Sequence, residues 1–387
     1  MLRGNYMKTA GSISTLHMIL LIMTFIGLKN HVTIIPAILE AVGRDGWASV
    51  ILGAIVSFIW LFLVVFVHNK SKQEHIRDWL KRKIGKVGSQ IVIYIFSFYL
   101  IALAAFTMRE TILWINSTFL IRTPMLPLLI IYTILIVYLV ASNIKTITIV
   151  NTFVLIGVLV LGFFVAFVNI QVKDYKLLKP FFEHGFEPIV YGMIYPASGF
   201  VELLLILFLQ HKLKDRMRWY HFAIILFILM GLTLGPLIGA ITEFGPIEAA
   251  KQRYPAYEEW GLATIGRFIE HVDFFSIYQW LTGAFIRIVV FLYVVADLLN
   301  ISGDRKRIST IIIPPFLFVC LILTLVKDNF FLEVNKREFL KLTFFFFVAM
   351  SIFLAIVARF PGKSSKKSSH ENDNKSGEIQ SNQTKNP

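Results

Sequence analysis

Residues 219–242 read WYHFAIILFILMGLTLGPLIGAIT, a run without aspartate, glutamate, lysine or arginine. The hydrocarbon core of a bilayer is about 30 Å thick, so an α-helix needs about 20 apolar residues to cross it. This run is long enough to do so. With nine further stretches of this kind, the sequence predicts ten transmembrane helices near residues 14–39, 46–67, 91–117, 124–142, 147–168, 190–210, 219–242, 273–298, 309–326 and 340–358.

The overall composition also indicates a membrane protein. The 387 residues are 56% hydrophobic and 16% charged, with a mean hydropathy of +0.70, whereas soluble domains average about 25% charged residues. We predict an all-α, multi-pass integral membrane protein in which residues 1–360 form one ten-helix membrane domain. Residues 361–387 are rich in Ser, Lys and Asn and have too little apolar content to form a core. We expect them to be a disordered basic tail in the cytoplasm.

The basic residues are unevenly distributed between the loops. They gather after the even-numbered stretches and in the tail, whereas loops after odd-numbered stretches mix both signs, so the positive-inside rule predicts that both chain ends are cytoplasmic. A net charge of +14 is also typical of nucleic-acid-binding proteins. Because these basic residues lie on one side of the membrane, we expect their positive charge to orient the protein beside anionic lipid. We predict no nucleic-acid partner. The basic residues concerned are Lys70, Lys72, Arg77, Lys81, Arg82, Lys83, Lys86, Lys145, Lys212, Lys214, Arg216, Arg218, Arg305, Lys306, Arg307, Lys363, Lys366 and Lys367.

Motifs of enzymes and cofactor sites are absent from the sequence. It contains no glycine-rich phosphate loop followed by Lys-Ser/Thr, no histidine pair at zinc spacing and no nucleophile elbow. Cys320 is the single cysteine, which excludes an internal disulfide framework. His221 and His271 are isolated in the sequence. We therefore expect no enzyme activity, no catalytic residue, no cofactor and no metal.

Ten stretches divide into two sets of five, and an odd number of crossings inverts the second set relative to the first. The first and sixth stretches become equivalent in such a five-plus-five inverted repeat, and polar or helix-breaking residues interrupt both. Residues 24–31 read TFIGLKNH, and residues 194–202 read IYPASGFVE. Broken helices at matching positions of two halves indicate a binding site near the middle of the membrane.

Two glycines in these interruptions mark the candidate ligand site. An unwound segment in a membrane needs partners other than lipid for its backbone groups, and Gly27 and Gly199 let a ligand approach the backbone. The start of each following half-helix is suited to a carboxylate. Alternatively, each glycine is a packing contact between helices. The residues assigned to the ligand site from these two stretches are Thr24, Gly27, Leu28, Ser198, Gly199, Phe200 and Glu202.

Further candidates for the ligand site lie on the third and eighth stretches. Tyr99 and Leu103 are four residues apart and share one helix face. Trp280 and Tyr293 lie on the eighth stretch, and core packing is the alternative for all four residues. Arg287 lies in the middle of the same stretch, where a charged side chain is costly and indicates function or pairing.

Arg287 stays protonated under all relevant conditions, so it cannot carry a proton. Its expected structural partners are Glu202 and Asp297, and Glu202 alternatively contacts a ligand ammonium or stabilises a helix break. Two other polar pairs are expected near the outer membrane surface, where long charged side chains reach water easily. Arg109 and Glu110 are predicted to form an ion pair there. Lys29 and His31 either meet a ligand carboxylate or lie at that interface, which we favour.

A known family shares the order and spacing of several residues along nearly the whole chain before the tail. No single motif is diagnostic, but the combination with ten stretches is specific. The residues are Pro36, Gly43, Asp45, Trp47, Ser49, Arg109, Glu110, Thr123, Pro124, Gly199, Phe200, Val201, Glu202, the run 268–273, Trp280, Gly283, Ala284, Phe285 and Arg287. On these grounds the chain resembles the B subunits of nutrient germinant receptors of endospore-forming bacteria. These proteins are the spore permease branch of the amino acid–polyamine–organocation superfamily.

The resemblance implies a fold and a function. It implies an amino acid transporter-like fold with broken helices 1 and 6, in which the third helix lines the site. It also implies recognition of a small germinant such as an amino acid, and assembly with an A subunit and a C lipoprotein in the spore inner membrane. Sodium-coupled proteins of this fold hold sodium between helices 1 and 8, and Arg287 is placed to substitute a fixed cation for that ion.

Three functional classes stay open from the sequence. The first is a receptor subunit that binds a germinant and triggers spore germination. The second is a secondary active amino acid transporter, and the third is a scaffold with a vestigial pocket. Matching glycines at positions 27 and 199 disfavour the third. Apolar surroundings near Leu103 and Phe200 favour a small neutral amino acid as ligand.

Overall fold

The computed structural model describes residues 12–264 and 272–361, and every regular element among them is a helix. Eight helical segments in these two ranges are long and apolar enough to cross a membrane. The prediction of an all-α integral membrane protein is therefore confirmed. His271 and nearly all of the predicted tail lie outside the described residues.

The helices are connected by short loops and by short stretches of π and 3₁₀ helix. The α-helices are α2 (Thr15–Leu28), α3 (Ile35–Val42), α4 (Gly46–Ser71), α5 (Ile76–Thr118), α6 (Met125–Val140), α7 (Ile144–Val168), α8 (Glu187–Gly192), α9 (Ile194–Phe200), α10 (Leu205–Leu209), α11 (Trp219–Phe244), α12 (Pro246–Lys251), α13 (Pro255–Gly261), α14 (Phe275–Leu298), α15 (Arg305–Ile311), α16 (Ile313–Leu325), α17 (Asp328–Glu333) and α18 (Leu340–Arg359).

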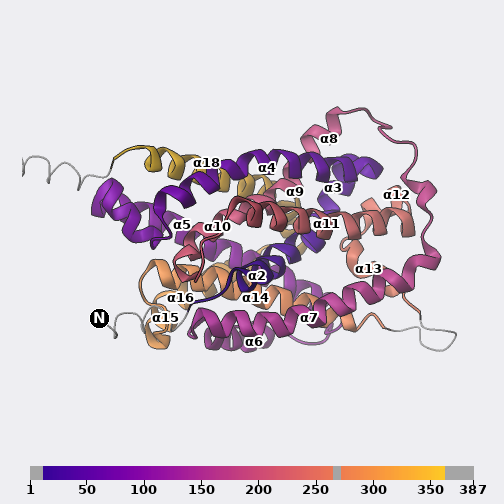
Figure 1. Cartoon of the computed structure of the whole chain (residues 1–387). Helices are drawn as coiled ribbons and strands as arrows, with labels where there is room; N and C mark the ends of the chain where they lie inside the picture. Colours follow the sequence, from indigo (N-terminus) through magenta and orange to yellow (C-terminus); the bar gives the residue numbers. More distant parts are fainter. Residues whose placement is uncertain (1–11, 265–271, 362–387) are drawn as a thin grey trace, which may run out of the picture.

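The long helices pack side by side in one bundle (Figure 1). Helices α4 and α18 lie along one side, α6 and α7 along the opposite side, and α2, α11 and α14 between them. The segment 187–212, which contains α9 and α10, is the most enclosed of the eight. In its most apolar stretch of 18 residues 89% of the residues are buried, against 17% for the segment 144–172. Large apolar side chains such as Phe62, Phe98 and Phe163 are exposed on the outside, as a lipid-facing surface requires.

The eight membrane-spanning segments do not match the ten predicted stretches one to one. The first segment, Thr15–Ser71, is 57 residues long and covers the first two predicted stretches. The chain turns between these two stretches at Gly43, which has a φ of +64°. The helix α4 then runs back beside α3 (Figure 1). The fourth stretch corresponds to α6, which is shorter than the other spans.

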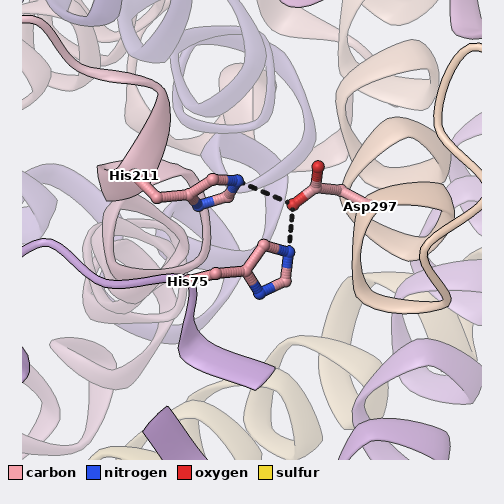
Figure 2. Close-up of side chains that lie close together, drawn as sticks. All are labelled: His75, His211 and Asp297. Carbon is pink, nitrogen blue, oxygen red and sulfur yellow. Dashed lines mark ion pairs between the residues drawn. The ribbon is translucent and has the colours of Figure 1, made fainter. Parts of the chain in front are cut away.

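Both ends of the described chain lie at the same end of the bundle. The Ile13 N–H donates to the Lys212 carbonyl at 2.8 Å, and the Lys212 ammonium lies 2.8 Å from Asp297. The Lys83 ammonium donates to the carbonyl of Phe360. We call this the Asp297 end (Figure 2). The opposite end, where α12 and α13 lie, is the Trp260 end (Figure 1).

The predicted unwinding of the first and sixth spans is wrong. Helix α2 continues through Gly27, and a π-helical turn, Lys29–Thr33, follows it. Ser198 and Gly199 lie inside α9, and a 3₁₀ turn, Val201–Leu204, follows that helix. The physical reason is that π and 3₁₀ turns keep the backbone hydrogen bonds within the segment, whereas an unwound chain leaves costly unsatisfied groups at membrane depth.

Candidate functional site

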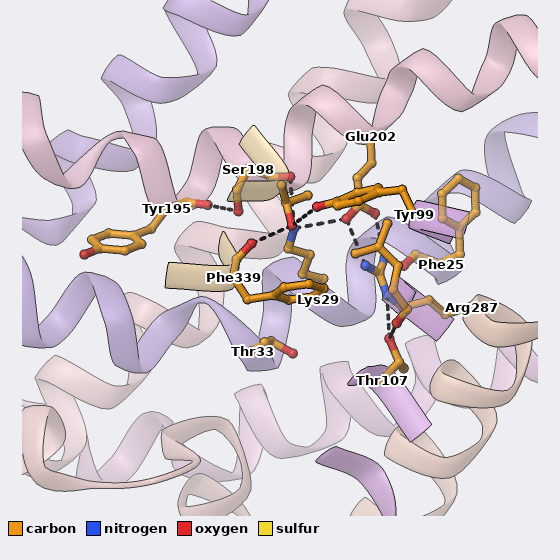
Figure 3. A network of polar contacts seen from close by, with 12 residues as sticks. Phe25, Lys29, Thr33, Tyr99, Thr107, Tyr195, Ser198, Glu202, Arg287 and Phe339 are labelled. Carbon is orange, nitrogen blue, oxygen red and sulfur yellow. Dashed lines mark hydrogen bonds and ion pairs between the residues drawn. The ribbon is translucent and has the colours of Figure 1, made fainter. Parts of the chain in front are cut away.

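A buried ionic network lies at the centre of the bundle (Figure 3). The Arg287 guanidinium of α14 donates to both oxygens of the Glu202 carboxylate, at 2.7 and 2.8 Å. It also donates to the Phe25 carbonyl of α2 at 2.6 Å and, through Nε, to the Thr107 hydroxyl of α5 at 3.3 Å. One side chain therefore ties together α2, α5, α14 and the 3₁₀ turn that carries Glu202.

Glu202 has a second cationic partner. The Lys29 ammonium lies 3.0 Å from Glu202 Oε1 and 3.0 Å from the Ser198 carbonyl, to which it also donates (Figure 3). Lys29 is 4% exposed, so our placement of it at the outer interface is wrong. The π turn after α2 directs this side chain inward, toward α9. Two cations and one carboxylate leave this network with a net positive charge.

The structure distinguishes between the two carboxylate partners expected for Arg287. Its carboxylate partner is Glu202, whereas Asp297 lies near the end of α14 and pairs with Lys212. The guanidinium also stacks over the Phe291 ring, 4.6 Å from its centroid. The position requires a planar cation that donates two hydrogen bonds and stacks on an aromatic ring, which suits arginine rather than lysine.

Arg109 and Glu110 do not form the predicted interfacial ion pair with each other. Arg109 pairs with Asp328 at 2.5 Å and donates to the Leu323 carbonyl at 3.2 Å, whereas Glu110 accepts a hydrogen bond from Thr33 at 3.1 Å. Neighbouring residues of an α-helix point in directions about 100° apart. The two side chains therefore contact different parts of the protein, and both are buried.

A cavity of about 240 Å³ lies on the other side of α2, between α2, α7, α11, α13 and α14. Four of the predicted site residues line it: Thr24, Gly27, Leu28 and Trp280. His31 was weighed as a ligand contact, and sequence reasoning missed the rest of the lining as a ligand site. The other lining residues are Met23, His31, Val32, Leu155, Val158, Leu159, Gly162, Phe163, Ala166, Gly231, Leu232, Gly235, Pro236, Ala256, Tyr257, Trp260, Ser276, Gln279 and Gly283.

Glycines from four helices create this space. A Cβ atom built on Gly231 or Gly235 meets no atom within 4 Å, and these two residues are four apart on one face of α11. Gly27, Gly162 and Gly283 line the other walls. The spacing of Gly231 and Gly235 was a signal in the sequence, although a glycine pair at this spacing equally indicates close helix packing.

The remaining predicted site residues lie away from this cavity. Leu103 and Arg287 line a separate space of about 20 Å³ beside Glu110, and Leu28 borders both spaces. Glu202 belongs to the ionic network, and the other five residues are buried in the bundle. Tyr99 donates to Thr343 and stacks on Phe346, Ser198 donates to Tyr195, Gly199 packs on Asn30, and Phe200 and Tyr293 belong to the apolar core.

For His31 the sequence left two placements, a contact with a ligand or the outer interface. Its ring Nδ1 is 3.1 Å from the Leu232 carbonyl of α11, and its side chain lines the cavity. It is therefore available to a ligand there. His221, by contrast, accepts a hydrogen bond from the Arg218 backbone at the start of α11, which is a helix-capping role.

Two carboxyl groups lie close together at the Trp260 end. Asn169 donates to Glu243 Oε2 at 2.9 Å and to the Glu259 carbonyl at 2.7 Å, and the Lys173 ammonium lies 3.4 Å from Glu243. Burial, and then the nearby charge of Glu243, raises the pKa of the Glu259 side chain well above its usual range. Glu259 is 8% exposed and lies on α13, outside the membrane-spanning segments.

We expect this raised pKa to make stability fall with increasing pH. The unfolded chain loses the Glu259 proton near pH 4.3, whereas the folded protein holds it to higher pH. The contribution of this group to stability is therefore complete below about pH 4.3 and is lost as pH rises through the folded pKa. Glu259→Gln should flatten the fall of Tm across this range in purified protein. An unchanged pH profile of Tm in Glu259→Gln would contradict the assignment.

Comparison with known proteins identifies the family. A family model described as spore germination protein, of the spore permease type, matches residues 12–331. The chain belongs to this spore permease family. The chain is also similar to spore germination protein XB of Bacillus anthracis, which is 43% identical over 297 residues, covering 77% of this chain and 82% of that protein. The resemblance drawn from the sequence is thus confirmed.

Two more distant spore permease relatives come from Bacillus subtilis strain 168. The putative spore germination protein YfkT is 25% identical over 313 residues, or 80% of this chain and 86% of YfkT. Spore germination protein KB is 20% identical over 304 residues, or 76% of this chain and 80% of its own length. Membership of the spore permease family gives the chain a role in spore germination.

Proposed function

We propose that this protein is the membrane subunit of a nutrient germinant receptor, which binds a small germinant and so triggers germination. The observation that carries the proposal is the glycine-lined cavity of about 240 Å³ between α2, α11 and α14. It lies across α2 from the central ionic network, and Leu28 borders both. A ligand that moves α2 would therefore act on Lys29 and on the Phe25 contact with Arg287.

The lining of the cavity favours a small germinant with a neutral, apolar side chain. Among its described lining residues there is no Asp, Glu, Lys or Arg, and most are aliphatic, aromatic or glycine. Thr24, His31 and Gln279 supply a few polar groups. A mainly apolar pocket with few polar groups is the usual arrangement for small-molecule sites. An amino acid with an aliphatic side chain fits this chemistry, with its polar groups directed to those three residues.

The contacts of Arg287 favour a receptor over a transporter. The permanently charged guanidinium of Arg287, on α14, donates to the Phe25 carbonyl of α2. In sodium-coupled proteins of the fold that the resemblance implies, sodium binds between the two corresponding helices. A fixed cation there removes the need for a bound ion. The alternative, a secondary active amino acid transporter, is favoured by the permease-type family and by the π and 3₁₀ turns in the first and sixth spans.

We further propose ten membrane crossings in a five-plus-five inverted repeat, with both chain ends in the cytoplasm. The turn at Gly43 divides the first long segment into two crossings, and α6 adds the tenth. An even number of crossings agrees with both described ends lying at the Asp297 end. Basic residues such as Lys83 and Lys212 gather at that end, which supports its placement in the cytoplasm.

Cysteine labelling tests this orientation. In a Cys320→Ala background, a membrane-impermeant maleimide added to intact cells should label Pro180→Cys and leave Lys83→Cys unlabelled. Pro180 lies in a loop, and Lys83 lies in the basic first part of α5, before the kink at Gly85. Permeabilised cells provide the control, because both cysteines should then react. Labelling of Lys83→Cys alone in intact cells would reverse the proposed orientation.

Filling the cavity should weaken germinant binding without unfolding the protein. In Gly235→Leu the new side chain enters open space, since a Cβ there meets no atom within 4 Å. Steric overlap with a bound germinant should cost about 1–3 kcal/mol, a loss of roughly 5- to 150-fold in apparent affinity. The measurement is the germination dose–response of spores carrying the variant, with the amount of receptor in the membrane determined in parallel.

Gly261→Leu is the matched control for this variant. Gly261 also has no atom within 4 Å of a built Cβ, but it does not line the cavity. We expect an unchanged dose–response from this control. A normal dose–response from Gly235→Leu, at a normal receptor level, would place the germinant elsewhere.

A further inference from the structure

A second polar cluster lies at the Asp297 end, remote from the cavity (Figure 2). His75 immediately precedes α5, His211 lies in the 3₁₀ turn Gln210–Lys212, and Asp297 is near the end of α14. The Nε2 atoms of His75 and His211 lie 2.9 and 3.1 Å from the same oxygen, Asp297 Oδ2. We propose that these three side chains bind a divalent metal ion of the zinc type.

The geometry is close to that of a metal site. The three ligand atoms all lie within 4.8 Å of one another. Zinc bonds of about 2.0–2.1 Å to nitrogen and oxygen at tetrahedral angles place ligand atoms about 3.3 Å apart. The observed separations of 2.9 and 3.1 Å therefore need only a small outward shift of each side chain. Two imidazoles and one carboxylate are also the ligand set of many zinc sites with an open position.

Unsatisfied atoms provide an independent indication. His211 Nε2 and Asp297 Oδ2 are buried and make no hydrogen bond of good geometry among the described residues, and the polar contact that joins them is the ion pair of 3.1 Å. Asp297 has a side chain that is only 4% exposed. Buried polar atoms in native proteins nearly always have partners. A metal ion between the two atoms would satisfy both.

Neighbouring groups hold the side chains of the cluster in place. Lys212 pairs with the other carboxylate oxygen, Asp297 Oδ1, at 2.8 Å, which holds the carboxylate in place as outer groups do at metal sites. His75 Nδ1 accepts a hydrogen bond of 3.2 Å from the Arg77 N–H. An imidazole that binds zinc through Nε2 carries its hydrogen on Nδ1, so metal binding requires this helix-capping bond of 3.2 Å to break.

A route to the cluster is present as well. A polar cavity of about 230 Å³ lies beside it, and His75, Arg77, Ser89 and Asn300 are among its lining residues. Lysines 81 and 86 line the same cavity, and their positive charge favours an anion as the fourth ligand of the metal. The bound ion would join α5, the turn after α10 and the end of α14, which are distant in the sequence.

Metal binding by the purified full-length chain tests the proposal. The protein is isolated through a tag without histidines, treated with EDTA, and titrated with Co²⁺ and then Zn²⁺. We expect one Co²⁺ per chain with visible absorption bands, displacement of Co²⁺ by Zn²⁺, and a rise in Tm on adding Zn²⁺. His211→Asn should remove the bands and the rise in Tm. His184→Asn, an exposed histidine outside the cluster, should keep both.

Two results would overturn the proposal. One is a metal-free wild-type chain that binds no Co²⁺ and shows no change in Tm with Zn²⁺, which would leave an ion-pair cluster only. The other is unchanged Co²⁺ binding in His211→Asn. If that variant does not fold, His75→Gln provides the same test, because its side-chain oxygen can still accept from the Arg77 N–H. Germination is not the readout, so failure here is distinct from failure of the receptor function.

Discussion

Arg287→Ala should abolish the germination response and strongly destabilise the protein. The substitution removes the two bonds to Glu202 and the bond to the Phe25 carbonyl, all of which are buried. Lys29 stays paired with Glu202, so the carboxylate keeps one cation, but the buried Phe25 carbonyl and one Glu202 oxygen lose their donor. Each buried group left unsatisfied costs about 1–3 kcal/mol, a large part of the about 5–15 kcal/mol that holds a typical domain folded. The measurements are the amount of receptor in the spore membrane, Tm in detergent, and the germination dose–response.

Arg287→Lys separates the role of the charge from that of the planar fork. Lysine keeps the positive charge but cannot donate to both Glu202 oxygens and to Phe25 in one plane. We expect it to retain part of the stability and part of the response. If Arg287→Ala remained folded and fully responsive, Arg287 would be an ordinary structural residue, and the substitution of a fixed cation for sodium would be excluded.

Gly199→Ala should have an effect of comparable size through packing alone. A Cβ atom on Gly199 would lie 1.8 Å from Asn30 Oδ1, and Asn30 is itself fixed by a hydrogen bond of 3.0 Å to Thr233 on α11. Either α9 must move away from the π turn after α2, or Asn30 must leave Thr233. Overpacking of this kind costs about 1–3 kcal/mol, and occasionally more. We expect little folded receptor in the membrane and a marked fall in Tm.

Gly27→Ala is the matched comparison in the first span. Its added Cβ would meet only the Leu232 side chain, at 3.2 Å, which can shift. We expect near-normal amounts of folded protein from Gly27→Ala, whereas Gly27→Leu should abolish the nutrient response while assembly continues, because it fills the cavity. Equal tolerance of alanine at positions 27 and 199 would contradict the described contact between α9 and Asn30.

The sequence was sufficient for the fold class and for one central contact. Apolar length alone indicates a multi-pass helical membrane protein, because the bilayer sets a strict requirement on helix length, although the described residues hold eight qualifying segments where ten stretches were predicted. The cost of an unpaired charge at membrane depth likewise indicated that Arg287 has a buried partner, and Glu202 was one of two candidates. The contact from Arg287 to the first span followed from the resemblance to a family, not from spacing.

Other features depend on which distant helices meet, which local patterns do not encode. Asp328, the partner of Arg109, is 219 residues away in the sequence. Lys29 adjoins polar residues and so looked interfacial, until packing against α9 brought its ammonium to Glu202. The histidine–aspartate cluster combines residues 75, 211 and 297, so no local spacing rule for metal ligands could detect it.

Binding and uptake of radiolabelled aliphatic amino acids by the purified chain in liposomes test the central claim, a ligand-binding receptor subunit, most directly. Both are measured with sodium and with potassium as the external cation, and with Gly235→Leu as the cavity-filled control. We predict saturable binding that is the same in both cations and lost in Gly235→Leu, without accumulation inside the liposomes. Gradient-dependent accumulation, or binding that requires sodium, would contradict this account and indicate a transporter.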